Sequence, residues 1–244
     1  MSGVYEDVGV LNEYLLFHYG SEEEILAGNA VWPQGMREAL DFAVRTPSHF
    51  TDREVARGLD LGCAVGRSTF EMSRHCEQVI GIDYSNGFIT AAKDLQQKGF
   101  LDYFRKEEAM LMSKLIAKLP EGVLADRVEF LQGDAMQLPE DLGEFDRVHA
   151  ANLICRLPEP GLLLSRFPEL VKKGGELVLA TPCTWLEQFT PVQNWPKAST
   201  MDWLKENLHE SFELIKLTEE PLLIRETSRK FQWTRSMLTV WLRM

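Results

Sequence analysis

Short apolar runs alternate with helical patterns from Arg57 onward in this chain of 244 residues. Runs rich in strand-forming residues predict five strands. These strands are Gly58–Leu61, Gln78–Asp83, Arg127–Gln132, Phe145–Ala150 and Glu176–Thr181. The apolar spacing between them predicts helices over Arg67–His75, Asn86–Gln97, Lys106–Leu119 and Gly161–Val171. Strands that alternate with helices are typical of a parallel sheet covered by helices on both faces, the doubly wound, Rossmann-like α/β class.

The predicted helix over Lys106–Leu119 is unusual because a strand–helix–strand step needs only one crossover helix. Its apolar residues Met110, Leu111, Leu115 and Leu119 fall at helical spacing. A helix over Asn86–Gln97 already makes that crossover. We therefore expect the second helix to be an insertion.

The C-terminal part of the chain predicts one more helix and two more strands. Ser199 is a suitable N-cap for a helix that runs to about His209. Phe212–Ile224 and Phe231–Arg243 are rich in strand formers and flank the polar segment Glu226–Lys230. These two segments are expected to close the sheet as an antiparallel pair.

The N-terminal segment has a different pattern. Four residues share one helical face, and they are Leu11, Tyr14, Leu15 and His18. Gly20 ends this helix, and Ser21 with Glu24 forms a capping box for the next one. We expect a single domain over residues 1–244, with a helical cap at 1–50 that folds over the pocket of a core at 51–244.

Composition narrows the function. The formal net charge is −11, which disfavours a nucleic-acid partner and favours a small-molecule substrate. The first residues are acidic and the chain has no apolar run of membrane-spanning length, so we expect a cytoplasmic protein without a membrane partner. The four cysteines show no metal-ligand or disulfide spacing, and we expect reduced, buried thiols and no metal site.

The segment 58–67 is the strongest indication of a cofactor site. An apolar strand with Asp60 near its end leads into a turn of small residues and then into a helix. The glycine spacing differs from that of a dinucleotide fingerprint. A carboxylate before the turn suits a cofactor with an ammonium group, which points to S-adenosylmethionine. The predicted cofactor residues of this segment are Asp60, Gly62, Cys63, Ala64, Gly66 and Arg67.

Three further strand ends supply candidate cofactor residues. Asp83 lies at the distance from the turn where an acidic residue binds ribose hydroxyls, and Tyr84 follows it; a helix cap is the alternative for Asp83. Asp134 and Ala135 suit the adenine, although such an aspartate also occurs at ordinary strand ends. Asn152 and Leu153 end the fourth strand, where an amide can donate and accept near the reacting groups, or simply cap the loop.

Aromatic residues on the first helix are candidates for the substrate site. Tyr14 and His18 stand four residues apart, with Phe17 and Tyr19 beside them. Such clusters commonly belong to the core, but a buried hydroxyl and imidazole need polar partners that a ligand can supply. The other four histidines lack such neighbours, and we expect structural or surface roles for His49, His75, His149 and His209.

The turn between the last two strands concentrates both signs of charge. Arg225 and Arg229 can present a fork to a carboxylate, and Glu226 can accept from an ammonium group. Trp185 and Trp233 are candidates for the walls around an aromatic ring. A solvated hairpin tip is the alternative explanation for the charges.

Beyond these motifs, the chain resembles the 5-thiohistidine (4-mercaptohistidine) N-methyltransferases of ovothiol biosynthesis, a branch of the class I S-adenosylmethionine-dependent methyltransferases. The segments that carry the resemblance are 13–20, 37–42, 59–67, 81–85, 184–190 and 224–233. The resemblance implies a seven-stranded sheet whose last strand is antiparallel. The family domain usually follows a sulfoxide synthase, which this sequence lacks, so a separate synthase is an expected functional partner. Ala64 departs from the general methyltransferase pattern, which prefers glycine there.

The function expected from this resemblance is N-methylation of the imidazole ring of 5-thiohistidine by S-adenosylmethionine. Such a transfer mainly requires alignment, and a hydrogen bond to one ring nitrogen leaves the lone pair of the other available. We assign this catalytic role to Tyr14, His18 or Asn152. The alternatives are a methyltransferase for another small amino acid or amine, and a non-catalytic cofactor-binding partner of a separate synthase.

Overall fold

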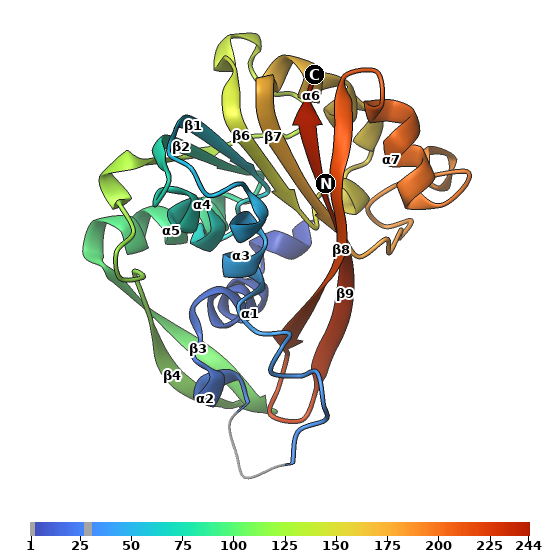
Figure 1. Cartoon of the computed structure of the whole chain (residues 1–244). Coiled ribbons are helices and arrows are strands. Elements are labelled where there is room, and N and C mark those ends of the chain that lie inside the picture. Colours follow the sequence, from blue (N-terminus) through green and yellow to red (C-terminus); the bar gives the residue numbers. More distant parts are fainter. Residues whose placement is uncertain (1–2, 27–30) are drawn as a thin grey trace.

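A seven-stranded sheet forms the centre of the computed structural model, which describes residues 3–26 and 31–244 (Figure 1). The strands are β1 (Val55–Leu61), β2 (Cys76–Asp83), β5 (Val128–Gln132), β6 (Phe145–Ala151), β7 (Val171–Thr181), β8 (Phe212–Arg225) and β9 (Phe231–Arg243). Their order is β5-β2-β1-β6-β7-β9-β8. The first five are parallel, and β9 is antiparallel to both β7 and β8. The expected Rossmann-like sheet with an antiparallel last strand is confirmed.

Helices cover both faces of this sheet. One apolar core lies on the face of α1 (Val8–Tyr19), α2 (Glu22–Ile25), α3 (Phe42–Arg45), α4 (Arg67–Met72) and α5 (Asn86–Lys98). A second core lies under α6 (Pro160–Leu170) and α7 (Thr200–Leu208). Figure 1 shows these two groups on opposite sides of the sheet. The parallel strands are buried on both faces, which explains their continuous apolar sequences.

The predicted helix over Lys106–Leu119 is wrong, because this segment belongs to a β-hairpin. The hairpin consists of β3 (Phe100–Glu108) and β4 (Leu111–Lys118), paired antiparallel in a sheet of their own. Tyr103 and Ala117 face the core and are buried, whereas Phe104 and Ile116 are exposed. This alternation has a period of two, and Figure 1 shows the hairpin extending below α5 and beside α1.

The N-terminal segment forms the expected helices. The Asp7 side chain caps α1 by accepting from the backbone N–H groups of Gly9 and Val10. The capping box of Ser21 and Glu24 is present at the start of α2. Residues 1–2 and 27–30 of the expected cap lie outside the described residues. In the part of the chain that is described, no helix is both long and apolar enough to cross a membrane.

Three smaller details differ from the sequence predictions. Strand β7 begins at Val171, directly after α6, so the segment 172–175 belongs to the strand and Gly174 adopts a left-handed φ of 75°. Helix α4 ends at Met72, three residues earlier than expected. There, the Ser73 hydroxyl donates to the Phe70 carbonyl and accepts from the Leu124 N–H. Of the four cysteines, Cys183 is exposed and the other three are buried.

Candidate active site

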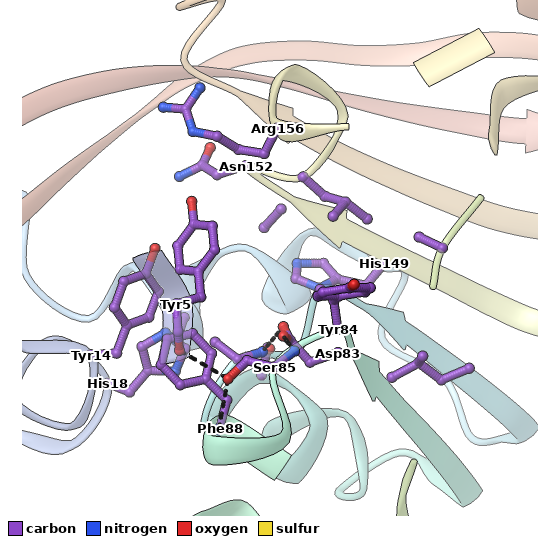
Figure 2. A pocket seen from close by; sticks show the side chains of 18 of the residues that line it. Tyr5, Tyr14, His18, Asp83, Tyr84, Ser85, Phe88, His149, Asn152 and Arg156 are labelled. Carbon is purple, nitrogen blue, oxygen red and sulfur yellow. Dashed lines mark hydrogen bonds between the residues drawn. The ribbon is translucent and has the colours of Figure 1, made fainter. Parts of the chain in front are cut away.

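One pocket lies at the carboxyl ends of β1, β2 and β6, where open α/β sheets bind their ligands. Residues after these strands form its floor, and residues of α1 and α3 form a wall. The short 3-10 helices η1 (Gly3–Glu6) and η5 (Ile154–Arg156) contribute Tyr5 and Arg156. Figure 2 shows the labelled side chains around this space. The pocket therefore joins parts of the chain that are far apart in the sequence.

The turn after β1 has an unusual backbone. Gly62, Ala64 and Gly66 all adopt left-handed conformations, with φ values of 70°, 48° and 86°. Ala64 occupies its position despite the cost that a Cβ incurs there. A Cβ on Gly66 would lie 2.6 Å from the ring of Phe130, so this glycine is required for packing. The turn places the N–H of Ala64 2.9 Å from Oδ2 of Asp83.

Asp83 is a preorganised acceptor at the end of β2. Its Oδ2 accepts from Ala64, and its Oδ1 accepts from the backbone N–H of Ser85 at 2.9 Å. Burial raises the pKa of Asp83 to about 6, although the two N–H donors act in the opposite direction. A carboxylate held in this way retains lone pairs for two further donors. These residues therefore fit the ribose diol of S-adenosylmethionine, with the half-exposed ring of Tyr84 beside it.

The predicted adenine region is only partly at the pocket. Gly133, Ala135 and Leu153 line it, and their surfaces suit a flat base. Asp134 instead accepts the N–H of Met136 at 2.9 Å, so its carboxylate stabilises a local turn. Within the described residues, the pocket lining does not include four of the predicted cofactor residues, namely Cys63, Gly66, Arg67 and Asp134. Arg67 pairs with Glu71 and donates to the carbonyl of His18, and this contact fixes α1 against α4.

The Asp60 carboxylate is hydrogen-bonded to three side chains of the protein. Its Oδ2 accepts from Ser68 at 2.6 Å and from Thr69 at 2.7 Å, and its Oδ1 lies 2.7 Å from Nδ1 of His149. Burial raises the pKa of Asp60, but the charge of His149 and the three hydrogen bonds outweigh it and place the pKa below its ordinary value. His149 is buried, as a structural residue is expected to be, but it also lines the pocket. Sequence reasoning did not include it in the site.

Helix α1 supplies the aromatic wall. Tyr14, Phe17 and His18 line the pocket, as the sequence suggested, and the ring of Phe88 packs 4.8 Å from that of Tyr14. Burial and the nearby charge of Arg67 lower the pKa of His18 to about 3, so its imidazole is neutral. The Nδ1 of His18 is buried and has no hydrogen-bond partner within the described residues. Tyr19 is turned away and donates to the carbonyl of Val65.

Asn152 directly follows β6 and has a left-handed conformation with φ of 54°. The buried hydroxyl of Ser236 donates to its Oδ1 at 2.7 Å, and the side chain lines the pocket. Arg156, which sequence reasoning missed, lines the same region. The chain offered one signal for it, an arginine four residues after a strand-end asparagine.

The charged turn between β8 and β9 does not contribute to the pocket lining within the described residues. Arg225 is buried and donates to Glu107 and to the carbonyl of Ile25. Glu226 pairs with Lys230, and the indole N–H of Trp185 donates to Thr200. Within the described residues, the pocket lining includes neither these predicted substrate residues nor Arg229. The nearby Ile224 does line the pocket.

Comparison with known proteins agrees with this geometry. Residues 59–179 match a family model described as a methyltransferase domain. Demethylmenaquinone methyltransferase of Lactococcus lactis subsp. lactis (strain IL1403) is 31% identical over 123 residues. That match covers 49% of this chain and 39% of the length of the relative.

Solved structures share the fold over a larger part of the chain. The N-methyltransferase NodS of Bradyrhizobium japonicum WM9, in complex with S-adenosyl-L-homocysteine, superposes with a TM-score of 0.53 at 16% identity, covering 93% of this chain and 98% of NodS. Magnesium protoporphyrin IX methyltransferase of Synechocystis PCC 6803 with bound S-adenosylhomocysteine gives 0.54 at 15% identity, covering 90% and 91%.

Residues 59–179 form a methyltransferase domain with a Rossmann-like fold. The pocket described above fits S-adenosylmethionine as the cofactor of this domain.

Proposed function

We propose that this protein methylates a ring nitrogen of 5-thiohistidine with S-adenosylmethionine to give ovothiol. The observation that carries this proposal is the position of α1, a segment in which the chain resembles thiohistidine methyltransferases. Its residues Tyr14, Phe17 and His18 line the same pocket as Asp83. An aromatic wall with a neutral imidazole suits a flat, polar, five-membered ring.

The structure gives His18 suitable chemistry for this role. A neutral imidazole donates through one nitrogen and accepts through the other. Because His18 lines the pocket, its acceptor nitrogen can accept the N–H of a bound imidazole ring and thereby fix the tautomer. The lone pair of the other ring nitrogen then remains available. This arrangement requires no strong base, because His18 orients the ring and does not remove its proton.

The reaction is balanced with the cofactor as methyl donor. When bound, S-adenosylmethionine would supply the methyl group. The lone pair of the substrate's ring nitrogen would form the N–C bond, the electrons of the broken C–S bond would stay on sulfur, and the methylated ring would release one proton to solvent water. Tyr14, Phe17 and Phe42 surround the ring side of the pocket and exclude water from it. A sulfoxide synthase is the class of enzyme that would supply the thiohistidine.

A turnover assay tests the proposal. The purified protein is incubated with S-adenosylmethionine and either 5-thiohistidine or histidine, and the product is identified by mass spectrometry and NMR. We expect methylation on nitrogen with 5-thiohistidine. Methylation of another small amine in its place would support the alternative methyltransferase. Absence of turnover with intact S-adenosylhomocysteine binding would support the non-catalytic partner.

A further inference from the structure

Three hydrogen-bond donors gather at the end of the pocket away from Asp83. They belong to Tyr5, Asn152 and Arg156, which come from η1, the end of β6 and η5. Figure 2 shows the hydroxyl of Tyr5 directed toward Asn152 and Arg156, whereas Asp83 and Tyr84 lie toward the other side in this view. The ribose site and this cluster are therefore different parts of one pocket.

The guanidinium of Arg156 uses only Nη1 for its hydrogen bonds to the described residues. Its Nη1 donates to the carbonyls of Cys155 and Thr184 at 3.1 Å and 2.8 Å, and its Cζ lies 5.0 Å from the ring centre of Phe189. No carboxylate of the described residues forms an ion pair with it, although the chain has a net charge of −11. Nη1 and the stacking contact fix the plane of the group. The remaining N–H groups can face a ligand with an anionic oxygen.

Asn152 is oriented as a donor. The hydroxyl of Ser236 donates to Oδ1 at 2.7 Å, so this oxygen is the end of the amide that faces Ser236. The amide nitrogen is therefore the end left for a ligand. The left-handed backbone at Asn152 and the hydrogen bond from its own N–H to the carbonyl of Ala180 hold this geometry. A rigid amide donor of this kind recognises an acceptor.

Tyr5 completes the cluster. Its ring packs against Tyr14 and Phe189 at centroid distances of 6.1 Å each, and its backbone carbonyl accepts from the Ser85 hydroxyl at 2.9 Å. Burial raises the pKa of Tyr5, and the charge of Arg156 opposes this effect. The hydroxyl is thus protonated at neutral pH and available as a donor beside the guanidinium.

We propose that Arg156, Tyr5 and Asn152 bind the carboxylate group of the amino-acid substrate. This inference rests on the proposed function, because it assigns an end of the substrate that carries an α-carboxylate. Three donors with a fixed cation suit a carboxylate and reject a neutral or cationic group. The carboxylate of the cofactor's methionyl group has the same chemistry, and the experiment separates the two sources.

The kinetic part of the test uses Arg156→Lys, which keeps the charge but loses the planar fork. Arg166→Lys is the matched control, since Arg166 also donates to two backbone carbonyls but lies on α6 outside the described pocket lining. We expect Arg156→Lys to raise KM for 5-thiohistidine at least tenfold. KM for the decarboxylated amine, and the calorimetric affinity for S-adenosylhomocysteine, should not change.

A second measurement does not depend on turnover. The side-chain Nε–H signal of Arg156 is assigned by its loss in Arg156→Lys, and acetate is added to the protein saturated with S-adenosylhomocysteine. We expect a saturable shift of this signal, weakened in Ser236→Ala, where the amide of Asn152 is no longer fixed. Arg166→Lys should retain the shift.

The outcomes separate the two proposals. Absence of 5-thiohistidine methylation by the parent protein, together with an acetate shift, rejects the proposed function and supports a carboxylate site. Methylation without an acetate shift, or with equal effects of Arg156→Lys on both substrates, overturns the carboxylate site. A loss of S-adenosylhomocysteine affinity in Arg156→Lys also overturns it, because Arg156 then binds the cofactor's carboxylate.

Discussion

The Nδ1 of His149 lies 2.7 Å from the Oδ1 of Asp60, and both side chains are buried, with His149 also lining the pocket. The two residues are direct neighbours in the parallel pairing of β1 and β6. The Nε2 of His149 lies 3.0 Å from the hydroxyl of Thr46, which follows α3. A single imidazole therefore connects the central strands to the segment that covers them.

Asp60→Asn should destabilise the fold strongly. A buried carboxylate that accepts from three protein groups loses its charge in this variant, and breaking a buried ion pair costs about 3–5 kcal/mol. We expect this loss in the free energy of unfolding, measured by urea denaturation. Asp102→Asn, which breaks an exposed pair with Lys114, is the control and should cost less than about 1 kcal/mol.

The pair of Asp60 and His149 should also make the stability of the fold depend on pH. The pKa of Asp60 lies below its ordinary value of 3.8, so its stabilisation is complete above that value and is lost as the pH falls through the lower, folded-state pKa. The parent protein should lose stability on acidification, and Asp60→Asn should lose less. If Asp60→Asn keeps the parent's stability but binds S-adenosylhomocysteine poorly, Asp60 serves the cofactor directly.

Asp83 should make cofactor affinity pH-dependent. Its pKa is raised to about 6, and the ionised form accepts the ribose hydroxyls, so binding weakens as the pH falls through 6. At pH 5, the dissociation constant of S-adenosylhomocysteine should be about tenfold higher than at pH 8.

Two variants test this prediction. Asp83→Asn should bind S-adenosylhomocysteine weakly, with an affinity that does not change with pH. Asp83→Ala should bind it at least tenfold more weakly than the parent, because hydrogen bonds to a charged group contribute about 1.5–3 kcal/mol. Calorimetric titration measures all three proteins. Unchanged affinity in the folded Asp83→Ala protein would remove this residue from the site.

His18→Asn should lower kcat about tenfold or more and leave the affinity for S-adenosylhomocysteine near that of the parent, because His18 lines the pocket and is the residue proposed to orient the substrate ring. Its pKa of about 3 means that it stays neutral from pH 5 to 9. The pH profile of kcat/KM in this range should therefore keep its shape in the variant. A profile that changes shape would show that His18 titrates during the reaction.

Tyr14→Phe keeps the aromatic ring and removes only the hydroxyl. If Tyr14 contacts the substrate, kcat/KM should fall while the melting temperature changes little, since the packing with Phe88 remains. Steady-state kinetics and thermal unfolding measure the two effects. Equal kinetics and equal melting temperature would mean that Tyr14 is only a core residue.

Arg225→Ala should reduce stability without altering substrate selection. Its guanidinium is buried, lies 2.6 Å from Glu107 and donates to the carbonyl of Ile25, so removal costs about 3 kcal/mol. The exposed Arg229 provides the control, because Arg229→Ala should be close to neutral. If Arg225→Ala folds and shows a large rise in KM for 5-thiohistidine but no loss of stability, Arg225 binds the substrate carboxylate.

The sheet was predictable because its signals are local. Each parallel strand is a short apolar run, and the turn after β1 carries its own spacing of small residues. The β3–β4 hairpin was missed for a similarly local reason. Its turn has Ala109 in the left-handed conformation, with φ of 46°, where a glycine would have indicated a reversal. Leu111 and Leu115 satisfy the helical spacing equally well.

The candidate site was harder to predict because its members are joined by tertiary contacts. The position of Asp83 at the pocket follows from one strand and its neighbour. The pairing of His149 with Asp60 depends on which strands lie side by side, and the ion pair of Arg225 depends on the missed hairpin that carries Glu107. Charge type alone could not distinguish Arg156 from Arg225 as the arginine at the pocket.

The contact between α1 and β8 has a consequence for biosynthesis. Residues 8–19 leave the ribosome long before residues 212–225, yet α1 packs against β8 and Ile224 completes the pocket lining. Arg225 also holds the carbonyl of Ile25. A nascent chain whose first 200 residues have emerged can pair β1, β2, β5, β6 and β7, and its α1 can pack against β3 and β4, but the side of α1 that contacts β8 stays uncovered. The pocket lining is therefore complete only after β8 has emerged, and until then part of the apolar surface of α1 is exposed to solvent.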